Sequence, residues 1–369
     1  MFITDLLFAF LILYGLEVLF LRLGIAKATA VQPAPPVPGC EPRVSVIVAA
    51  RDEEQFIERC LTSIAESDYP AEKLEIIAVN DHSTDRTEEL IRTVMQRYPC
   101  VRLVQTGDER GNLRGKTNAV AKAIGASTGE ILMFTDADCT VSKSWVRKTV
   151  SYFDQNTGIV GGFTHLPAGS TFAAMQTLDW IVLFSISSGT AGWGIPLTVV
   201  GNNLALRRAA YDATGGFEKI PFSVTEDYAI VRAILRQKVY GLRFPLDSET
   251  IVASTPCASW RQLFRQKQRW SVGGLNMIAE GFLIAAVNWA FHLALVVSLF
   301  FVNLPVWLGV LAVAWIIDLW LVWKPLQRMG ATKTLRYFAG FELYYTLYTI
   351  TIPFLAILSK KVVWKERSW

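Results

Sequence analysis

Two aspartates with one residue between them, Asp136 and Asp138, come just after the apolar run Ile131–Phe134. In an extended segment, side chains two positions apart point the same way, so both carboxylates would face one site. Carboxylate oxygens suit hard divalent ions, Mg²⁺ or Mn²⁺, and such ions commonly bridge to the phosphates of a substrate. The alternative is an ordinary turn, because aspartate is common where a strand ends. The pair alone favours the turn, so its position in the fold has to decide.

Two more aspartates, Asp52 and Asp81, also follow short apolar runs. The runs Arg43–Ala50 and Leu74–Val79 are rich in β-branched residues, which is typical of buried parallel strands. Ligands of such sheets sit beyond the carboxyl ends of the strands. The aspartates come from separate places in the sequence, yet this fold would bring them to one edge. A cluster at that edge favours a metal site for the Asp-x-Asp pair.

Strands that alternate with helices should position this edge. Apolar residues at helical spacing follow Asp52, which we expect to N-cap the first helix. This alternation predicts an α/β fold with a mostly parallel sheet covered on both faces. The expected strands are 43–50, 74–79, 101–104 and 131–134, and the later helices are 85–97 and 116–126.

Further motifs follow in order along the chain: NDHSTD at 80–85, KTNA at 116–119, GNNLALRR at 201–208, SVTEDY at 223–228 and QKQRW at 266–270. Together with FTDAD at 134–138 they resemble the family 2 membrane glycosyltransferases, which have a GT-A fold. That group includes the ceramide glucosyltransferases and the cellulose, chitin, hyaluronan and poly-N-acetylglucosamine synthases. The ordered set of motifs is specific, although each motif alone is not.

The resemblance implies an inverting transfer of a sugar from a nucleotide diphosphate, usually UDP, with a divalent metal. Asp136 and Asp138 would hold Mg²⁺ or Mn²⁺ on the diphosphate, so that Asp136 also serves nucleotide binding. Asp81 would contact the nucleoside, as would the segment at Arg51 and Asp52. One departure stands out, because relatives carry Asp-Asp-Gly or Asp-Asn where this chain has Asn-Asp-His at 80–82. That leaves the role of the asparagine open.

Lys116 and the Thr-Glu-Asp motif supply the remaining candidates at this edge. A lysine in the first turn of a helix is mildly disfavoured by the helix dipole, but its charge would be well used near a diphosphate. An inverting displacement needs a base, for which Asp227 is the family match, with Glu226 as a supporting residue. The structural alternative is that Ser223 or Thr225 caps a helix over 227–237 and that the acidic pair complements its dipole. Both roles are compatible.

The segment 258–273 carries a basic stripe and several aromatic residues, which predicts an amphipathic helix on an anionic membrane surface. Within it, Gln266, Arg269 and Trp270 match the Gln-x-x-Arg-Trp motif of the family. The resemblance implies that Trp270 stacks against the acceptor and that Arg269 offsets the charge of the leaving diphosphate. The helix would then be both a membrane anchor and a wall of the active site.

Four apolar runs flank the central domain, at 6–23, 282–302, 304–323 and 337–358, and 52% of the chain is hydrophobic. The first run would span about 27 Å of hydrocarbon. A cleaved signal peptide is the alternative, but the first residues include Asp5 and no basic residue. Arg22 and Lys27 place the next domain in the cytoplasm. The charge of the basic tail also favours the cytoplasm. Four simple spans, with the central domain in the cytoplasm, would instead place the tail outside. Either the charge rule fails there or one segment is re-entrant or interfacial.

We therefore expect a multi-pass protein of the bacterial inner membrane with a cytoplasmic catalytic domain. Five cysteines without CxxC spacing suit that reducing compartment, and a formal net charge of +4 is too small to indicate nucleic acid. The expected parts are a transmembrane helix over 1–24, a proline-rich linker over 25–42, the GT-A domain over 43–257, the interfacial helix over 258–275 and about three helices over 276–369.

The expected activity moves a sugar, from UDP-glucose or UDP-N-acetylglucosamine, to a membrane lipid at the cytoplasmic leaflet. The alternative is a processive polysaccharide synthase that exports a glycan, which requires a polar path walled by several helices. Four apolar segments are few for such a path, which favours the lipid. Retention of Asp138 and Asp227 argues against a non-catalytic scaffold. A nucleotidyltransferase would not be expected to carry the Thr-Glu-Asp and Gln-x-x-Arg-Trp motifs.

Overall fold

The computed structural model describes residues 2–34, 39–109, 111–358, 363–364 and 367–368. The chain divides into two compact units. The sheet unit comprises Ala28–Leu166 and Thr198–Thr255, and the helical unit comprises Met1–Lys27, Pro167–Leu197 and Pro256–Trp369.

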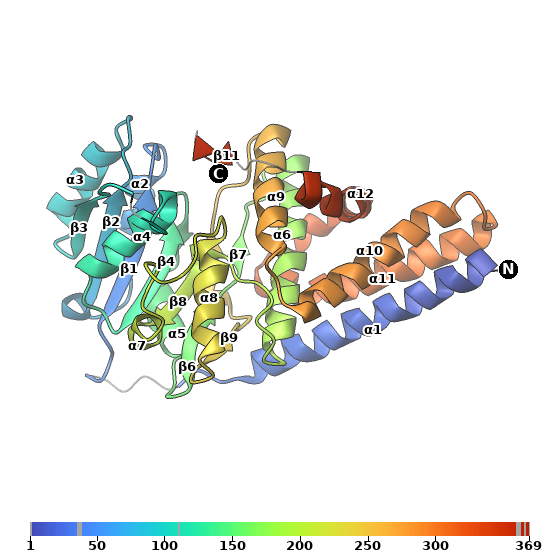
Figure 1. Cartoon of the computed structure of the whole chain (residues 1–369), viewed down its shortest axis with the longest axis horizontal. Helices are drawn as coiled ribbons and strands as arrows, with labels where there is room; N and C mark the ends of the chain where they lie inside the picture. Colours follow the sequence, from blue (N-terminus) through green and yellow to red (C-terminus); the bar gives the residue numbers. More distant parts are fainter. Residues whose placement is uncertain (1, 35–38, 110, 359–362, 365–366, 369) are drawn as a thin grey trace. The chain divides into compact units, whose positions relative to one another are not determined.

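The sheet unit contains a seven-stranded sheet with the strand order β3-β2-β1-β4-β8-β6-β9 (Figure 1). Every strand in it is parallel to the others except β8, which runs antiparallel to both of its neighbours. This confirms the expected mostly parallel sheet. The strands are β1 (Val44–Ala50), β2 (Leu74–Asn80), β3 (Val101–Gln105), β4 (Ile131–Asp136), β6 (Thr157–Gly161), β8 (Leu204–Arg207) and β9 (Gly241–Arg243).

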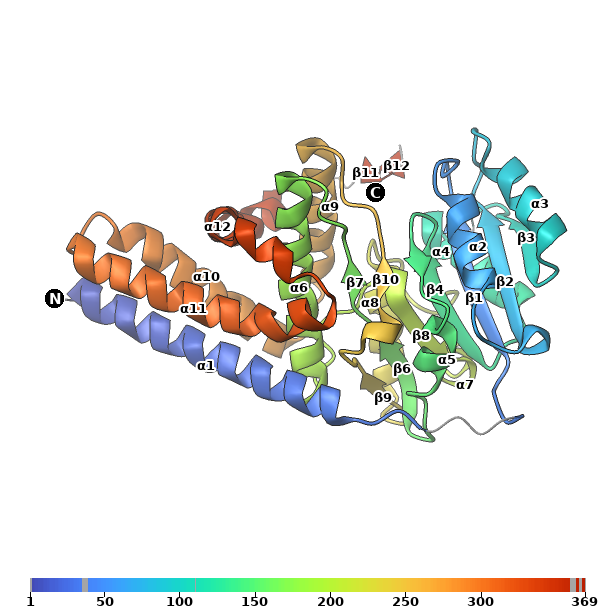
Figure 2. The same ribbon diagram turned by 180° about the vertical axis from the view of Figure 1, so that it is seen from behind.

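Helices cover both faces of the sheet because its central strands are apolar on both sides. Figures 1 and 2 show α2 (Ile57–Ala65) and α3 (Thr87–Arg97) on one face, with α4 (Gly115–Ala126) on the other. The register places Ala49 of β1 beside Asp136 of β4, and the next residue of β1 beside Asn80 of β2. The carboxyl ends of three strands therefore meet at one edge, as the sequence predicted.

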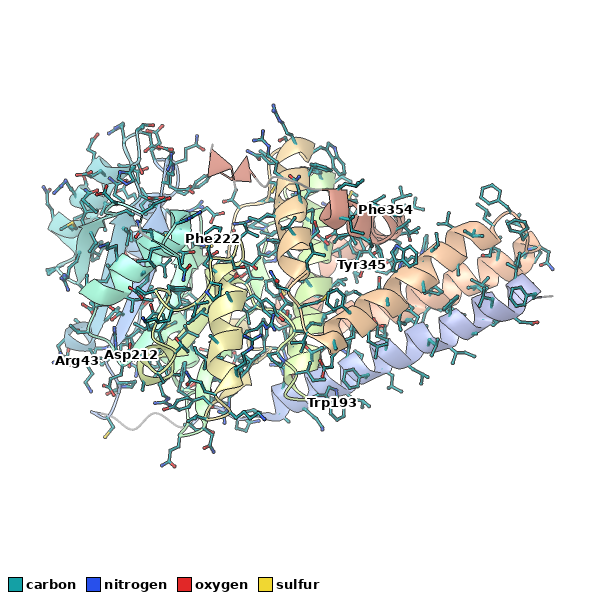
Figure 3. The ribbon with its side chains drawn as sticks, in the orientation of Figure 1. Arg43, Trp193, Asp212, Phe222, Tyr345 and Phe354 are labelled. Carbon is teal, nitrogen blue, oxygen red and sulfur yellow. The ribbon has the colours of Figure 1, made fainter. Side chains whose placement is uncertain are left out.

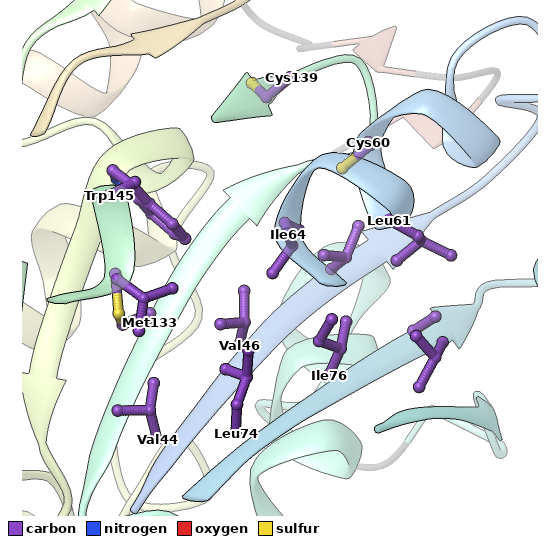
Figure 4. Packing of buried hydrophobic residues seen from close by; sticks show 14 of the residues in the cluster. Val44, Val46, Cys60, Leu61, Ile64, Leu74, Ile76, Met133, Cys139 and Trp145 are labelled. Atoms are coloured by element: carbon purple, nitrogen blue, oxygen red, sulfur yellow. The ribbon is translucent and has the colours of Figure 1, made fainter. Parts of the chain in front are cut away.

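The core between the sheet and α2 is close-packed, as Figure 4 shows. Leu61 and Ile64 of α2 lie over Val46 of β1 and Ile76 of β2, and all four side chains are buried. The buried positions of α2 recur at the spacing of one helical face, which is the pattern that predicted this helix. This packing fixes the strand ends that carry the site.

The prediction that Asp52 caps α2 is wrong. The N-cap residue of α2 is Phe56, and Asp52 lies in the left-handed region with φ 52°. Its Oδ1 accepts hydrogen bonds from the backbone N of Thr84 at 2.8 Å and from the Thr84 hydroxyl at 3.2 Å. The carboxylate therefore joins the loops after β1 and β2 instead of capping the helix.

Shorter elements complete the sheet unit. A three-stranded sheet has the order β5-β10-β7, with β10 antiparallel to β5 and parallel to β7. It brings the chain after β10 next to the Asp-x-Asp loop. The remaining elements are α5 (Trp145–Val150), α7 (Arg208–Asp212), α8 (Glu226–Arg236), β5 (Thr140–Val141), β7 (Thr164–His165) and β10 (Val252–Ala253).

The helical unit contains α1 (Phe2–Ala30), α6 (Thr171–Ala191), α9 (Trp260–Gly274), α10 (Ala279–Ser298), α11 (Leu304–Arg328), α12 (Phe338–Leu358), β11 (Val363–Trp364) and β12 (Arg367–Ser368). Helices α1, α10 and α11 run side by side (Figures 1 and 2). Among the described residues, these three helices are long and apolar enough to cross a membrane. The basic tail residues Lys360, Lys361 and Lys365 lie outside the described residues.

Four helices of this unit share a buried polar cluster. The hydroxyl of Tyr14 in α1 donates a hydrogen bond to the carboxyl group of Asp318 in α11, which also bonds to the carboxyl group of Glu342 in α12. The Tyr14 ring meets the edge of the His292 ring of α10 at 5.7 Å. Tyr345, labelled in Figure 3, also packs against this histidine, with 5.4 Å between the ring centroids. Buried polar side chains that bond to one another in this way link the helices that carry them.

Candidate functional site

A recess opens at the carboxyl ends of β1 and β4, within the sheet unit. Its floor is apolar and its rim is charged. Three carboxylates and one ammonium group meet at the rim, from β4, α4 and the start of α8. The lining residues are Ile47, Ala49, Lys116, Val120, Phe134, Thr135, Asp136, Gly201, Leu204, Phe217, Glu226, Asp227 and Ile230.

Lys116 joins the two acidic motifs at this rim. Its Nζ lies 2.5 Å from Oδ1 of Asp136 and 3.4 Å from Oε1 of Glu226. Burial alone would lower the pKa of Lys116, but the charges of Asp136 and Glu226 outweigh burial and raise this pKa above its ordinary value. The side chain therefore stays a cation between carboxylates that approach it from different segments.

Asp227 is held by backbone donors. Its Oδ2 accepts a hydrogen bond from the backbone N of Gly201 at 2.7 Å, and its Oδ1 accepts one from the backbone N of Tyr228 at 2.8 Å. Burial and the Glu226 charge raise the pKa of Asp227, while Lys116 and the two hydrogen bonds lower it, which leaves the pKa at about 6. A carboxylate with such a pKa suits proton transfer near neutral pH.

The structural alternative, in which Ser223 or Thr225 caps the helix, holds for the position of Thr225 but not for a side-chain capping bond. In the described structure, Thr225 is the N-cap residue of α8 but its side chain makes no capping hydrogen bond. The Ser223 hydroxyl accepts a bond from the backbone N of Thr225 at 3.2 Å. Asp227 is the second residue of α8, and its carboxylate instead accepts the hydrogen bond from the backbone N of Tyr228 in the first turn. Glu226 and Asp227 both lie in that turn, where acidic residues complement the helix dipole.

Asp138 is oriented by residues that sequence reasoning missed. Its Oδ2 accepts a hydrogen bond from the Ser254 hydroxyl at 2.9 Å and a longer one from the backbone N of Thr255 at 3.4 Å. Burial, followed by the charge of Asp136, raises the pKa of Asp138. Ser254 follows β10, more than a hundred residues further along the chain. Only the pairing of the small sheet brings it there, and no sequence motif marks it.

The donor set of the two aspartates fits a hard divalent ion. Mg²⁺ and Mn²⁺ prefer oxygen ligands, and Mg²⁺ usually keeps several waters while taking one or two carboxylates and the phosphates of a substrate. Asp136 lies at the open rim, with its side chain 37% exposed. No cluster of three or more His, Cys, Asp or Glu side chains that could hold a metal occurs among the described residues. An ion held by these two carboxylates would therefore need further oxygen ligands, which water and the diphosphate of a donor can supply.

The residues expected to contact a nucleoside lie at the neighbouring strand ends. Asp81 is buried directly after β2, where its backbone N donates a hydrogen bond to the carbonyl of Ala50 at 2.8 Å. Arg51 follows β1 and lies 3.8 Å from the Asp52 carboxylate. Asn80 donates hydrogen bonds to two side chains of the same unit and accepts one from the loop. It therefore shapes the turn that contains His82.

Gln266, Arg269 and Trp270 lie on α9 of the helical unit. The ring of Trp270 meets the ring of Trp180 in α6, with 5.5 Å between their centroids. The predicted set is thus divided between the units. Within the sheet unit, the structure brings Lys116, Asp136, Glu226 and Asp227 into one recess.

Comparison with known proteins places this geometry among sugar-transferring enzymes. The model of a family described as glycosyl transferase family 21 matches residues 7–369. The chain is 28% identical over 253 residues to the beta-monoglucosyldiacylglycerol synthase of Synechocystis sp., covering 63% of this chain and 48% of that relative. It is 27% identical over 250 residues to the probable glycosyltransferase YdaM of Bacillus subtilis, covering 65% and 57%. The chain spans about half the length of these curated relatives.

One solved structure is similar over most of both chains. The mannosyltransferase PcManGT from Pyrobaculum calidifontis, in complex with GDP-Man and Mn²⁺, has a TM-score of 0.63 and 22% sequence identity. The match covers 93% of this chain and 99% of that one. At this identity the likeness concerns the fold, and it confirms the fold class expected from the ordered motifs.

Proposed function

The chain belongs to glycosyl transferase family 21, and from this premise we propose that it transfers a sugar from a nucleotide-diphosphate donor to a membrane lipid. The donor is UDP-glucose or UDP-N-acetylglucosamine, and the transfer inverts the anomeric carbon. The observation that carries the proposal is the position of Lys116, whose ammonium contacts Asp136 and Glu226 in the recess that Asp227 lines. A group suited to a diphosphate and a group suited to an acceptor hydroxyl therefore share one recess.

The residues of the recess divide the reaction between them. Asp136 and Asp138 would hold Mg²⁺ or Mn²⁺, which neutralises charge on the diphosphate when it is bound. Asp227 takes the proton of the acceptor hydroxyl as that oxygen attacks the anomeric carbon of the sugar. The bond from this carbon to the diphosphate breaks, and the nucleoside diphosphate leaves with the electron pair. Lys116 adds a fixed positive charge close to the leaving group.

The remaining predicted residues bind the two substrates. Arg51, Asp52 and Asp81, at the ends of β1 and β2, contact the nucleoside. Gln266, Arg269 and Trp270 of α9 serve the acceptor and the leaving diphosphate, in the roles that the family resemblance implies. These assignments come from the ordered motifs and from the strand register. They are separate from the geometry of Lys116 and Asp227, and they need their own variants.

Two observations favour a lipid acceptor over an exported glycan. The relative from Synechocystis is named for a monoglucosyldiacylglycerol product. Among the described residues, only α1, α10 and α11 meet the length and composition of membrane spans, which is few for a polar export path. The same three helices, with Arg22 and Lys27 near the end of α1, support a multi-pass protein of the bacterial inner membrane. Its sheet unit would then face the cytoplasm.

Product analysis tests the proposal directly. The purified full chain in lipid vesicles receives Mg²⁺ or Mn²⁺ and a panel of radiolabelled UDP-sugars and GDP-mannose. We expect label in one organic-soluble lipid, and no label with Asp227→Asn. The surface variant Asp212→Asn, at an exposed aspartate labelled in Figure 3, is the matched control and should keep full activity. Label in a water-soluble, enzyme-digestible polymer would replace the lipid proposal by the polysaccharide one. No transfer from any donor would contradict both.

A further inference from the structure

Helix α6 carries a buried polar pair that faces the segment with the Gln-x-x-Arg-Trp motif. Both the nitrogen and the oxygen of the Gln176 side-chain amide form hydrogen bonds with the backbone of one residue, Cys257. Its Nε2 donates to the Cys257 carbonyl at 3.0 Å, and its Oε1 accepts from the Cys257 backbone N at 2.8 Å. Cys257 lies two residues before Ser259, the N-cap of α9. Gln176 therefore fixes the point at which α9 begins.

One turn further along α6, Asp179 forms an ion pair with Lys267 in the middle of α9. Both side chains are 5% exposed. The ammonium of Lys267 also lies 4.7 Å from the ring centroid of Trp270 and 4.6 Å from that of Tyr348 in α12. The cation is thus enclosed by one carboxylate and two aromatic faces. One of these faces belongs to the motif itself.

A buried ion pair is an inefficient way to hold two helices together. Removing both charges from water costs about as much as their attraction returns, so an apolar pair of similar volume would serve stability equally well. What the pair adds is direction, because its hydrogen-bond geometry admits one arrangement. Lys267 lies on the buried face of α9 with Leu263 and Ser271, one turn away on either side. Successive residues of a helix are 100° apart, so the rotation of α9 about its axis that lets Lys267 reach Asp179 also sets the directions of Gln266 and Trp270.

We propose that Gln176 and Asp179 are positioning residues for the acceptor site on α9. Gln176 sets where the helix starts, and Asp179, through Lys267, sets its rotation about its own axis. The inference rests on the proposed function, in which Trp270 and Arg269 act on the acceptor and on the leaving diphosphate. It assigns a specific task to a helix that carries none of the family motifs.

The double variant Asp179→Leu/Lys267→Met tests the proposal. It removes both charges at similar volume, whereas either single variant would leave a buried charge unpaired and would destabilise the unit for that reason alone. Ser185→Ala is the matched control, since this buried serine of α6 bonds to the carbonyl of Ile181 in its own helix. Lys267→Arg keeps the ion pair and should retain most of the activity.

Two readouts are measured in vesicles with the full chain. In the double variant, we expect kcat/KM for the acceptor to fall at least tenfold while KM for the nucleotide sugar stays within twofold of wild type. Hydrogen exchange of backbone amides over residues 257–274 should become at least tenfold faster, with no change in Ser185→Ala. Wild-type values for both readouts would overturn the proposal, and so would equal losses for donor and acceptor.

Failure of the proposed function is distinguishable from failure of this inference. If the wild-type protein transfers no sugar, the proposed function fails, and the positioning role then stands or falls on the hydrogen exchange of α9. If the wild type is active and the double variant matches it in kinetics, the function stands and the positioning role is rejected.

Discussion

The ammonium of Lys116 lies 2.5 Å from the carboxylate of Asp136. The ammonium thus places a positive charge against a carboxylate to which a metal ion could also bind. If Asp136 holds a divalent ion as proposed, the lysine and the ion would compete for this carboxylate until a bound diphosphate offers the lysine other oxygens. The pair also keeps the carboxylates of the recess from repelling one another before the donor binds.

Lys116→Met should change the affinities for metal and for nucleotide in opposite directions. Without the competing ammonium, we expect Mn²⁺ to bind about tenfold more tightly in the absence of nucleotide, and the nucleotide sugar to bind about tenfold more weakly, each a change of about 1.4 kcal/mol. Isothermal titration with Mn²⁺ and with the donor measures both. Lys122→Met, at an exposed lysine of the same helix, is the control. A loss of both affinities would show that Lys116 merely supports the fold.

The pH dependence of kcat/KM should follow the ionisation of Asp227, the proposed base. Burial and Glu226 raise the pKa of Asp227 to about 6, and the residue acts as a base only when it is ionised. We therefore expect kcat/KM to fall tenfold per unit as the pH drops below about 6. Glu226→Gln removes a neighbouring negative charge, so it should lower the pKa of Asp227 and move this acid limb to lower pH. A limb that stays in place in the variant would exclude Asp227 as its source.

Gly201→Ala should disturb the base without unfolding the protein. An added Cβ would lie 3.2 Å from both Cβ and Oδ2 of Asp227, which requires the carboxylate to shift by a few tenths of an ångström. We expect kcat to fall about tenfold, because catalysis is sensitive to such displacements. Gly125→Ala, where the new Cβ meets nothing within 4 Å, is the control. Steady-state rates and thermal melting together separate a moved base from a destabilised fold.

Ser254→Ala should weaken metal activation. The hydroxyl donates to Oδ2 of Asp138, and loss of a group that orients a metal ligand typically costs 10–100-fold in affinity or activity. We expect the Mn²⁺ concentration for half-maximal rate to rise by about tenfold, the low end of that range. Ser254→Thr keeps the hydroxyl and should be close to wild type. Equal activation constants in all three proteins would mean that Asp138 needs no such support.

The first half of the sheet could be predicted because its signals are local. Each of β1, β2 and β4 is a short β-branched or apolar run followed by a polar turn, and α4 and α8 start within a residue of the expected positions. The register of parallel strands then places Asp81 and Asp136 at one edge without further information. Residue types and spacing were sufficient there.

The second half required tertiary information. The strands β6, β8 and β9 are short, and their pairing joins segments distant in sequence, so no local pattern specifies it. Helix α6 lies inside the range expected for the catalytic domain, yet it belongs to the helical unit. Gly201 and Ser254 act through contacts with distant aspartates, and the carboxylate of Asp52 bonds to Thr84 in another loop instead of capping α2.

The hydrogen bond between Tyr14 and Asp318 has a practical consequence for protein engineering. If α1 were only a tether, residues 2–30 could be deleted or exchanged for any other apolar span. Instead, its removal would take away the hydrogen bond that Tyr14 donates to Asp318 and leave this buried carboxyl group of α11 with its bond to Glu342 of α12 alone, and a buried polar group that loses a partner destabilises the fold. A truncated enzyme freed of its first helix would lose the packing of the remaining bundle, and a chimera would need a tyrosine at the matching turn.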